Sequence, residues 1–207
     1  MSIREAVHGG LHVGLQQGLV VGARVYDPDG RLVHEVVQPA HSYVVNWAHL
    51  LNYHLSEAAQ SSTGITDVSG NSRTLATTSY FHRPAAAAAT SVYGIVVGTG
   101  ATAVAMTDTA LVTQVAHGTS AGQLNHYAVA TYPVDTTGAN PRYTNISRAF
   151  QNNSGTAIAI AEVGMYSQHA TTVGSPSTFL VARDLLSFTI GVGQLSIVQY
   201  ALIFNLT

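Results

Sequence analysis

The chain has no cysteine, no lysine and little charge of either sign. Without cysteine, neither disulfide bonds nor thiolate chemistry is open to it. Charged residues make up 9% of its 207 residues, whereas an average domain has about a quarter. Most of the surface must therefore consist of small polar and apolar side chains, and the formal net charge of −2 is too small to keep copies apart by repulsion. This composition predicts a subunit of a protein assembly.

The charge pattern also argues against two other classes of partner. The eight basic residues are all arginine and are scattered, whereas nucleic-acid binding needs clustered basic groups. The uncharged run 84–107 is the one membrane candidate, and its apolar part is shorter than the roughly 20 residues that a span requires. At the N-terminus, Arg4 and Glu5 precede an apolar run broken by two glycines, which is a poor signal peptide. We therefore expect no nucleic acid, no membrane and synthesis in a cytoplasm.

The last stretch, Leu195 to Leu206, has the alternation of a β-strand. One of its faces is wholly apolar and consists of Val198, Tyr200, Leu202, Phe204 and Leu206. A strand with such a face needs neighbours on both edges and a second layer above it. We expect it to be the central strand of a packed sheet.

Other segments show the same period between turn residues. The clearest pair is 19–26 and 32–37, a hairpin around Asp27-Pro28-Asp29-Gly30, in which proline presets the turn and glycine supplies a positive φ. Further strands are predicted at 91–97, 124–132, 143–151, 156–165, 178–190 and 196–206. Between the hairpin and these strands, 42–60 has a helical period with Ser42 as its N-cap, which predicts one amphipathic helix.

These elements predict a mainly β fold, an antiparallel β-sandwich or jelly-roll-like arrangement with an N-terminal β-hairpin and one amphipathic helix. We divide the chain into an N-terminal arm (1–18), a hairpin plus helix region (19–83), an alanine-rich strap (84–90) and a β-sandwich (91–207). The arm is glycine-rich and shows neither the helical nor the strand period of apolar residues, so we do not expect it to pack as a regular element. We expect it to lie on a neighbouring subunit.

Residues 98–103 (GTGATA) match the dinucleotide fingerprint G-x-G-x-x-A and follow a predicted strand. The fingerprint needs a helix N-terminus at the pyrophosphate and an acidic residue about 20 positions further on. Asp135 is the first acidic residue after Asp108 and lies too far along, and no βαβ pattern follows. We interpret 98–103 as a glycine-rich strand end and loop, and we expect no cofactor.

Ten histidines raise the question of a metal site. His8 and His12 are four apart, but the two glycines between them disfavour the helix that would align them. His49 and His54 are five apart and fall on different faces of the predicted helix. The remaining candidates have no carboxylate at ligand spacing: His41, His117 and His126. We expect polar or interface histidines and no metal site.

Glu162 and Arg183 each fall on an apolar strand face, Glu162 beside Ile158 and Ile160. Because buried carboxylates are rarely unpaired, we predict an ion pair that fixes strand register. A more specific alternative is that Glu162 is the general acid of a glycosidase, but only Asp184 in that region could be the second carboxylate that such an enzyme needs. We therefore assign no catalytic residue.

Seven aromatic residues could line a sugar-binding surface, and tyrosine at protein interfaces explains them equally well. They are Tyr80, Phe81, Tyr93, Tyr127, Tyr132, Tyr143 and Tyr166.

Several stretches carry a family resemblance. They are GTGATAVAMTDTAL, AHGTSAGQLNHYAV, RAFQNNSGTAIAIAEVGMY and FLVARDLLSFTIGVGQLSIVQYALIF, together with HSYVVNWAHLLNYHL followed by TDVSG. They resemble a poorly characterised family of structural proteins of tailed bacteriophages, over roughly residues 20 to 207. EVGMY and AGQLNHY are the most specific parts and mark no chemistry. The chain departs from typical members in its extra histidines and its lack of lysine.

The resemblance implies a virion component of the capsid or tail and not an enzyme, made in the host cytoplasm and associated with copies of itself and other virion proteins. The low charge, the glycine-rich arm and the all-β pattern agree with this expectation. Two alternatives stay open. One is a carbohydrate-binding or adhesin module that binds a host-surface glycan. The other is a subunit of a self-assembling extracellular filament, whose arm adds a strand to the next subunit.

Overall fold

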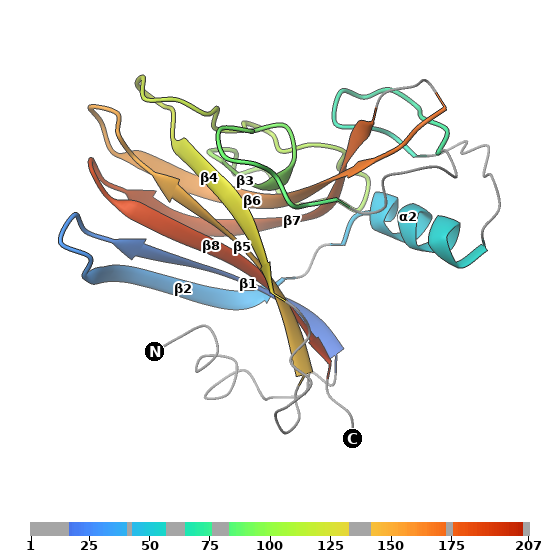
Figure 1. The fold of residues 1–207 in the computed structure, drawn as a ribbon, viewed down its shortest axis with the longest axis horizontal. Coiled ribbons are helices and arrows are strands. Elements are labelled where there is room, and N and C mark those ends of the chain that lie inside the picture. Colours follow the sequence, from blue (N-terminus) through green and yellow to red (C-terminus); the bar gives the residue numbers. More distant parts are fainter. Residues whose placement is uncertain are drawn as a thin grey trace.

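The chain folds into two antiparallel β-sheets packed face to face, with one helix at the end of the sandwich (Figure 1). This computed structural model describes residues 17–40, 43–56, 65–75, 83–132, 142–172 and 176–204. Its elements in chain order are β1 (Gln17–Tyr26), β2 (Leu32–Ala40), α2 (Val45–Ser56), β3 (Gly94–Gly98), β4 (Asn125–Tyr132), β5 (Arg142–Gln151), β6 (Ile158–His169), β7 (Ser177–Ile190) and β8 (Leu195–Phe204). The predicted fold class is confirmed.

β8 lies at the centre of the larger sheet, whose strand order is β2-β1-β8-β5-β4. It pairs antiparallel with β1 on one edge and with β5 on the other. Val198 and Tyr200 are buried, whereas Ile197 and Gln199 on the other face are half-buried. The central position predicted for this strand is confirmed.

The N-terminal hairpin is part of this sheet. Leu19 of β1 is in register with Ala40 of β2 on one side and with Leu202 of β8 on the other. Residues from both ends of the chain therefore form one continuous sheet, and the hairpin is joined to the predicted sandwich region by backbone pairing. The smaller sheet has the order β3-β6-β7 and forms the second layer (Figure 1).

The main core lies between the two sheets. Its buried strand residues are Leu19, Val21, Ala23 and Val25 of β1, Ile95 and Val97 of β3, Phe150 of β5, Ile158, Ile160, Val163 and Met165 of β6, Phe179, Val181, Ala182, Leu186, Phe188 and Ile190 of β7, and Val198 and Tyr200 of β8. Alternate residues of most strands enter this core, as a period of two requires. At the end next to α2, Leu50, Ile65 and Leu75 extend it.

A second apolar cluster lies on the outer face of the smaller sheet. It is covered by 99–113, the first part of the long connection between β3 and β4, which we call the connection 99–113. Val96, Tyr166 and Leu180 come from the three strands, and Leu111 comes from the connection. The predicted alanine-rich strap joins the cluster through Ala86, whose carbonyl accepts a hydrogen bond from Val129 of β4 at 2.8 Å.

Several predicted boundaries are corrected. The helix begins at Val45 and not at 42, and it is described to Ser56; Ser42 and 57–60 lie outside the described residues. β3 begins at Gly94 and not at 91, and β6 continues to His169, past the predicted end at 165. Of the predicted arm, 17 and 18 belong to β1 and 1–16 lie outside the described residues. Among the described residues, no helix is long and apolar enough to cross a membrane.

Candidate functional site

Glu162 is fully buried on the outer face of the smaller sheet, beneath the connection 99–113. Its Oε1 accepts hydrogen bonds from the backbone N–H groups of Gly100 at 3.2 Å and Thr113 at 2.8 Å. Its Oε2 accepts from the Val112 N–H at 3.1 Å and from Nε of Arg183 at 2.8 Å. Each carboxylate oxygen therefore accepts two hydrogen bonds, and together these attach both ends of the connection 99–113 to β6.

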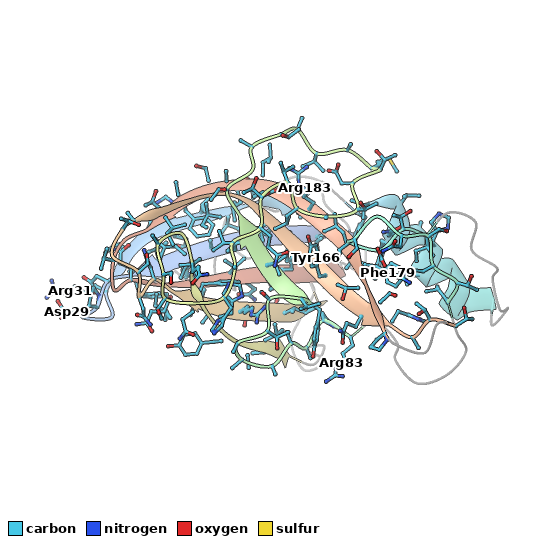
Figure 2. The ribbon with its side chains drawn as sticks, turned by 90° about the horizontal axis from the view of Figure 1, so that it is seen from above. Asp29, Arg31, Arg83, Tyr166, Phe179 and Arg183 are labelled. Atoms are coloured by element: carbon cyan, nitrogen blue, oxygen red, sulfur yellow. The ribbon has the colours of Figure 1, made fainter. Side chains whose placement is uncertain are left out.

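Arg183 is on β7, beside Glu162 of β6, and is also fully buried. Figure 2 labels Arg183 and Tyr166, which come from neighbouring strands of the smaller sheet. Its Nη1 donates to Asp108 Oδ2 at 2.7 Å, and its Nη2 donates to the Thr102 carbonyl at 2.9 Å. Burial lowers the pKa of Arg183, but the hydrogen bonds and charges of Asp108 and Glu162 outweigh this effect and raise the pKa. The structure thus brings the two predicted residues together and adds Asp108 as a second carboxylate. The face predicted for them is wrong: the β6–β7 register shifts at Ile160/Glu162 and at Met165/Tyr166, so the pair lies on the outer face while Ile158, Ile160, Phe179 and Val181 face the core.

Asp108 was missed by the sequence analysis because it lies in a segment without regular secondary structure. Its Oδ2 also accepts from the Ala105 N–H at 2.9 Å, which forms a tight local turn. An aspartate three residues after the N–H group that it binds is the one local sign of this turn in the sequence. Nothing in the sequence indicates that Asp108 pairs with Arg183. Tyr166 completes the attachment by accepting a hydrogen bond from the Leu111 N–H at 2.7 Å, and burial raises the pKa of its hydroxyl to about 12.

The two glycines of the 98–103 motif are required by Glu162. A Cβ atom at Gly98 or at Gly100 would lie 2.5 Å from Glu162 Oε1, closer than real Cβ contacts allow. No helix follows the motif in the described segment 99–124, so the arrangement that holds a pyrophosphate is not formed there. The interpretation of this motif as a strand end and loop agrees with the structure.

The geometry around Glu162 does not suit a glycosidase acid. Its side chain has no exposed surface, and backbone N–H groups and Arg183 occupy its oxygens. Asp184, the only partner considered from the sequence, is in register with Val163 and therefore lies on the opposite face of the sheet. There its Oδ2 accepts from the Tyr200 hydroxyl at 3.1 Å in the core. A general acid must reach the leaving-group oxygen, which neither carboxylate does.

Arg148 of β5 forms a second buried polar centre that the sequence analysis missed. It is 1% exposed, and its Nε donates to the Tyr127 carbonyl at 2.8 Å. The other acceptors of its guanidinium are the carbonyl groups of Tyr93, Ile95, Ala87 and Thr90. Burial lowers the pKa of Arg148 to about 10, so it stays protonated near neutral pH. The sequence did contain a sign of this burial, because Arg148 shares a face of its strand with the apolar residues Ile146 and Phe150.

His126 and His117 lie beside this centre. The His126 ring is buried and makes edge-to-face contacts with Phe150 and His117, with ring centres 5.1 and 5.6 Å apart. Burial, Arg148 and His117 lower the pKa of His126 to about 3. No group of three possible metal ligands occurs among the described residues, which include His49, His117 and His126. His8, His12 and His41 lie outside them, and the side chain of His54 is not described.

Of the seven aromatic residues, the structure places only Tyr127 on an open surface. Tyr93 and Tyr166 are buried, Tyr80 and Phe81 lie outside the described residues, and the side chains of Tyr132 and Tyr143 are not described. Tyr127 is 40% exposed and borders an open groove of about 460 Å³.

This groove lies at the turn end of the larger sheet, on the face away from the core. It is lined by Tyr26, Asp27, Pro28, Gly30, Tyr127, Gln151, Gly193, Leu195 and Ile197. Leu195 and Ile197 of β8 supply apolar surface, and the two tyrosines come from β1 and β4. The Tyr127 hydroxyl donates to Gln151 Oε1 at 2.8 Å. The groove combines aromatic rings with a carboxylate and an amide.

The remaining charged side chains that the structure describes are few. Besides the buried groups, Arg24 pairs with Glu35 at 2.7 Å and Arg73 pairs with the buried Asp67 at 2.5 Å. The other charged side chains that the structure describes are Asp27, Asp29 and Arg31 on the β1–β2 turn, Arg83, and the partly exposed Asp108 described above. Asp29 and Arg31 project from the far tip of the hairpin (Figure 2).

No family model, curated protein or solved structure matches this chain.

Proposed function

We propose that this protein is a non-enzymatic structural subunit of a tailed-phage virion, a capsid decoration or a tail or fibre component, which associates with copies of itself and other virion proteins. The observation that carries the proposal is the placement of its charges. Five of the charged side chains in the described residues are buried: Asp67, Arg148, Glu162, Arg183 and Asp184. The surface is therefore even poorer in charge than the composition indicates, and such a surface favours protein contacts.

The segments behind the phage resemblance support the proposal in a second way. The GTGATAVAMTDTAL, EVGMY and VARDLL segments supply Asp108, Glu162 and Arg183, which meet beneath the connection 99–113. Arg148 comes from the RAFQ segment and holds the strap. These segments thus build the framework of the sandwich and hold loops in place, which is the use a structural subunit has for them.

Electron microscopy of the purified full chain tests this proposal. We expect negatively stained samples to contain discrete assemblies of uniform shape, such as rings, shells or tubes. A field that contains only single molecules of 21.7 kDa at high protein concentration would contradict the proposal.

A second candidate function, glycan binding, is favoured by the groove at the turn end. The rings of Tyr26 and Tyr127 could stack on the apolar face of a sugar, while Asp27 and Gln151 could hydrogen-bond its hydroxyl groups. A glycan array with the wild-type chain and Tyr127→Ala tests it. Specific signals that disappear in the variant would support this function, and an array without signal above background would remove it.

A further inference from the structure

Three of the four sheet edges are covered by segments of the chain itself. The edge of β4 is paired with the strap, as the Val129 N–H donates to Ala86. The edge of β3 is paired with residues 113–115, since the Val115 N–H donates to the Val97 carbonyl at 2.9 Å. Exposed edges invite pairing with other chains, and proteins cover them in this way.

The edge of β7 is covered at several points. The Val44 N–H donates to the Val181 carbonyl at 3.2 Å, and the Val68 N–H donates to the Thr178 carbonyl at 2.9 Å. Further along, the side chain of Gln38 donates to the Leu185 carbonyl at 2.8 Å. The smaller sheet is thus protected on both sides.

The fourth edge, that of β2, has no backbone partner among the described residues apart from β1 on its inner side. The Gln38 contact occupies the end of the strand that also contains Pro39, so the open part is Leu32–Val37. Leu32 and Val33 at its beginning are 43% and 50% exposed. As far as the described residues show, this edge therefore carries both backbone groups without a partner and exposed apolar side chains.

The sequence of this open edge, LVHEVV, favours pairing with another strand. It is rich in β-branched residues, has no proline and carries one acidic side chain. That side chain, Glu35, is neutralised by Arg24 at 2.7 Å, so two such edges would not repel each other. Lysine, which many proteins place on exposed strands to prevent edge-to-edge pairing, is absent from the whole chain.

We propose that β2 pairs antiparallel with β2 of a second copy of this chain about a two-fold axis. The two five-stranded sheets then form one sheet of ten strands (5 + 5), with the core faces of both copies on the same side. This inference rests on the proposed function, because it names one contact through which copies associate. A pairing of six residues per copy is a small interface, so we expect a dimer with a dissociation constant on the order of micromolar.

Two matched lysine substitutions test which surface forms the contact. Val33→Lys adds a charge at the β2 edge, and Val92→Lys adds the same charge at a valine that is 57% exposed before β3. In sedimentation velocity runs, we expect Val33→Lys to weaken dimer formation by about tenfold or more and Val92→Lys to leave it nearly unchanged. Equal effects of the two variants, or none from Val33→Lys, would overturn the pairing.

Single-cysteine variants give an independent readout, because the chain contains no cysteine of its own. Directly opposite residues of antiparallel strands lie about 4.5 to 5.5 Å apart at Cα, which is within disulfide range. We expect His34→Cys or Val36→Cys, whichever lies nearest the two-fold axis, to form a disulfide-linked dimer on mild oxidation. Thr189→Cys, exposed on β7, is the control and should remain monomeric under the same conditions.

These results separate this inference from the proposed function. If the wild-type chain assembles but no β2 cysteine cross-links and Val33→Lys assembles normally, the β2 contact is wrong and the structural role stands. If the wild-type chain is monomeric at every concentration, both are wrong.

Discussion

Arg148 and Arg183 are both excluded from solvent, yet they are stabilised differently. Arg183 contacts two carboxylates, Asp108 and Glu162. The guanidinium of Arg148 donates to backbone carbonyl groups of β3, of Tyr93 just before it, of β4 and of the strap. Five N–H donors in a fixed planar arrangement can satisfy this many acceptors, whereas a lysine has three donors on a flexible stem. At these two positions arginine is therefore the suitable cation.

Removal of the Glu162 charge is expected to destabilise the protein strongly. Glu162→Gln leaves Arg183 with one carboxylate and directs an amide donor at backbone N–H groups, so we expect a loss of about 3–5 kcal/mol of unfolding free energy. Glu35→Gln, which breaks the more exposed pair with Arg24, is the control and should cost about 1 kcal/mol or less. Urea denaturation measures both. Similar losses in the two variants would contradict this role of Glu162.

His126 should make stability depend on pH. Its pKa is lowered from 6.5 to about 3, so the folded protein keeps the ring neutral while the unfolded chain takes up a proton below pH 6.5. The free energy of unfolding should therefore fall as the pH decreases from 6.5, by up to about 1.4 kcal/mol per pH unit. Burial raises the pKa of Asp67, but hydrogen bonds from Asn71, Arg73 and Ser69 outweigh this effect and lower it. The stability that Asp67 contributes is therefore complete above its ordinary pKa of 3.8 and is lost only at lower pH, outside the range in which His126 is tested.

His126→Phe isolates this contribution, because phenylalanine fills a similar space against Phe150. Denaturation curves at pH 6.5 and pH 5 should show a smaller decrease in stability for the variant than for the wild type. Equal decreases in the two proteins would show that His126 does not titrate on unfolding.

At the scale of elements, the connection 99–113 shows how a segment without regular structure is fixed. It contributes N–H groups to Glu162 and Tyr166, carbonyl groups to Arg183, and Leu111 to the cluster on the outer face of the smaller sheet. Backbone polar groups of a covered loop need partners, and here charged side chains from β6 and β7 supply them. The glycines at 98 and 100 allow the backbone to approach Glu162.

Gly98→Ala is expected to loosen this connection. The added Cβ would lie 2.6 Å from the Thr113 carbonyl oxygen, a backbone atom that cannot rotate away, and we expect a loss of about 1–3 kcal/mol. Gly155→Ala is the control, because a Cβ there has no neighbour within 4 Å. Thermal unfolding gives the stabilities, and limited proteolysis should cut 99–113 faster in Gly98→Ala. Unchanged stability and cleavage would contradict the close packing described.

The elements themselves could largely be predicted because local signals define them. Alternation indicated β8 and its buried face, and Asp27-Pro28-Asp29-Gly30 marked the hairpin turn, where Gly30 has a φ of 81°. The pairing partners could not be predicted in this way. β1 pairs with β8, far away in the sequence, and that contact depends on how both sheets pack and not on local residue patterns.

The buried polar centres were predictable in part. A charged residue on an apolar strand face indicated Glu162 and Arg183, since burial of charge requires a partner. Asp108 and the carbonyl groups around Arg148 lie in the connection 99–113, in the strap and near β3, where no period relates sequence to position. Their roles follow only from the folded arrangement.

At the scale of the whole molecule, the buried charges and the exposed apolar residues have the same consequence. Charged groups that are buried inside the molecule do not repel other copies, and large apolar side chains are exposed at the β2 edge and elsewhere, among them Leu32, Val33, Met106, Val112 and Val192. Burial of such residues between subunits would contribute roughly 25 cal/mol per Å² of apolar surface. We therefore expect association to be driven by apolar contact and to weaken little at high salt.

The mass of the purified full chain, measured by sedimentation equilibrium over about 1 to 100 µM, tests this account most directly. The account predicts that the apparent mass rises with concentration above 21.7 kDa, reaches a defined multiple of it, and does so at both low and high salt. A mass that stays at 21.7 kDa over the whole range would contradict it.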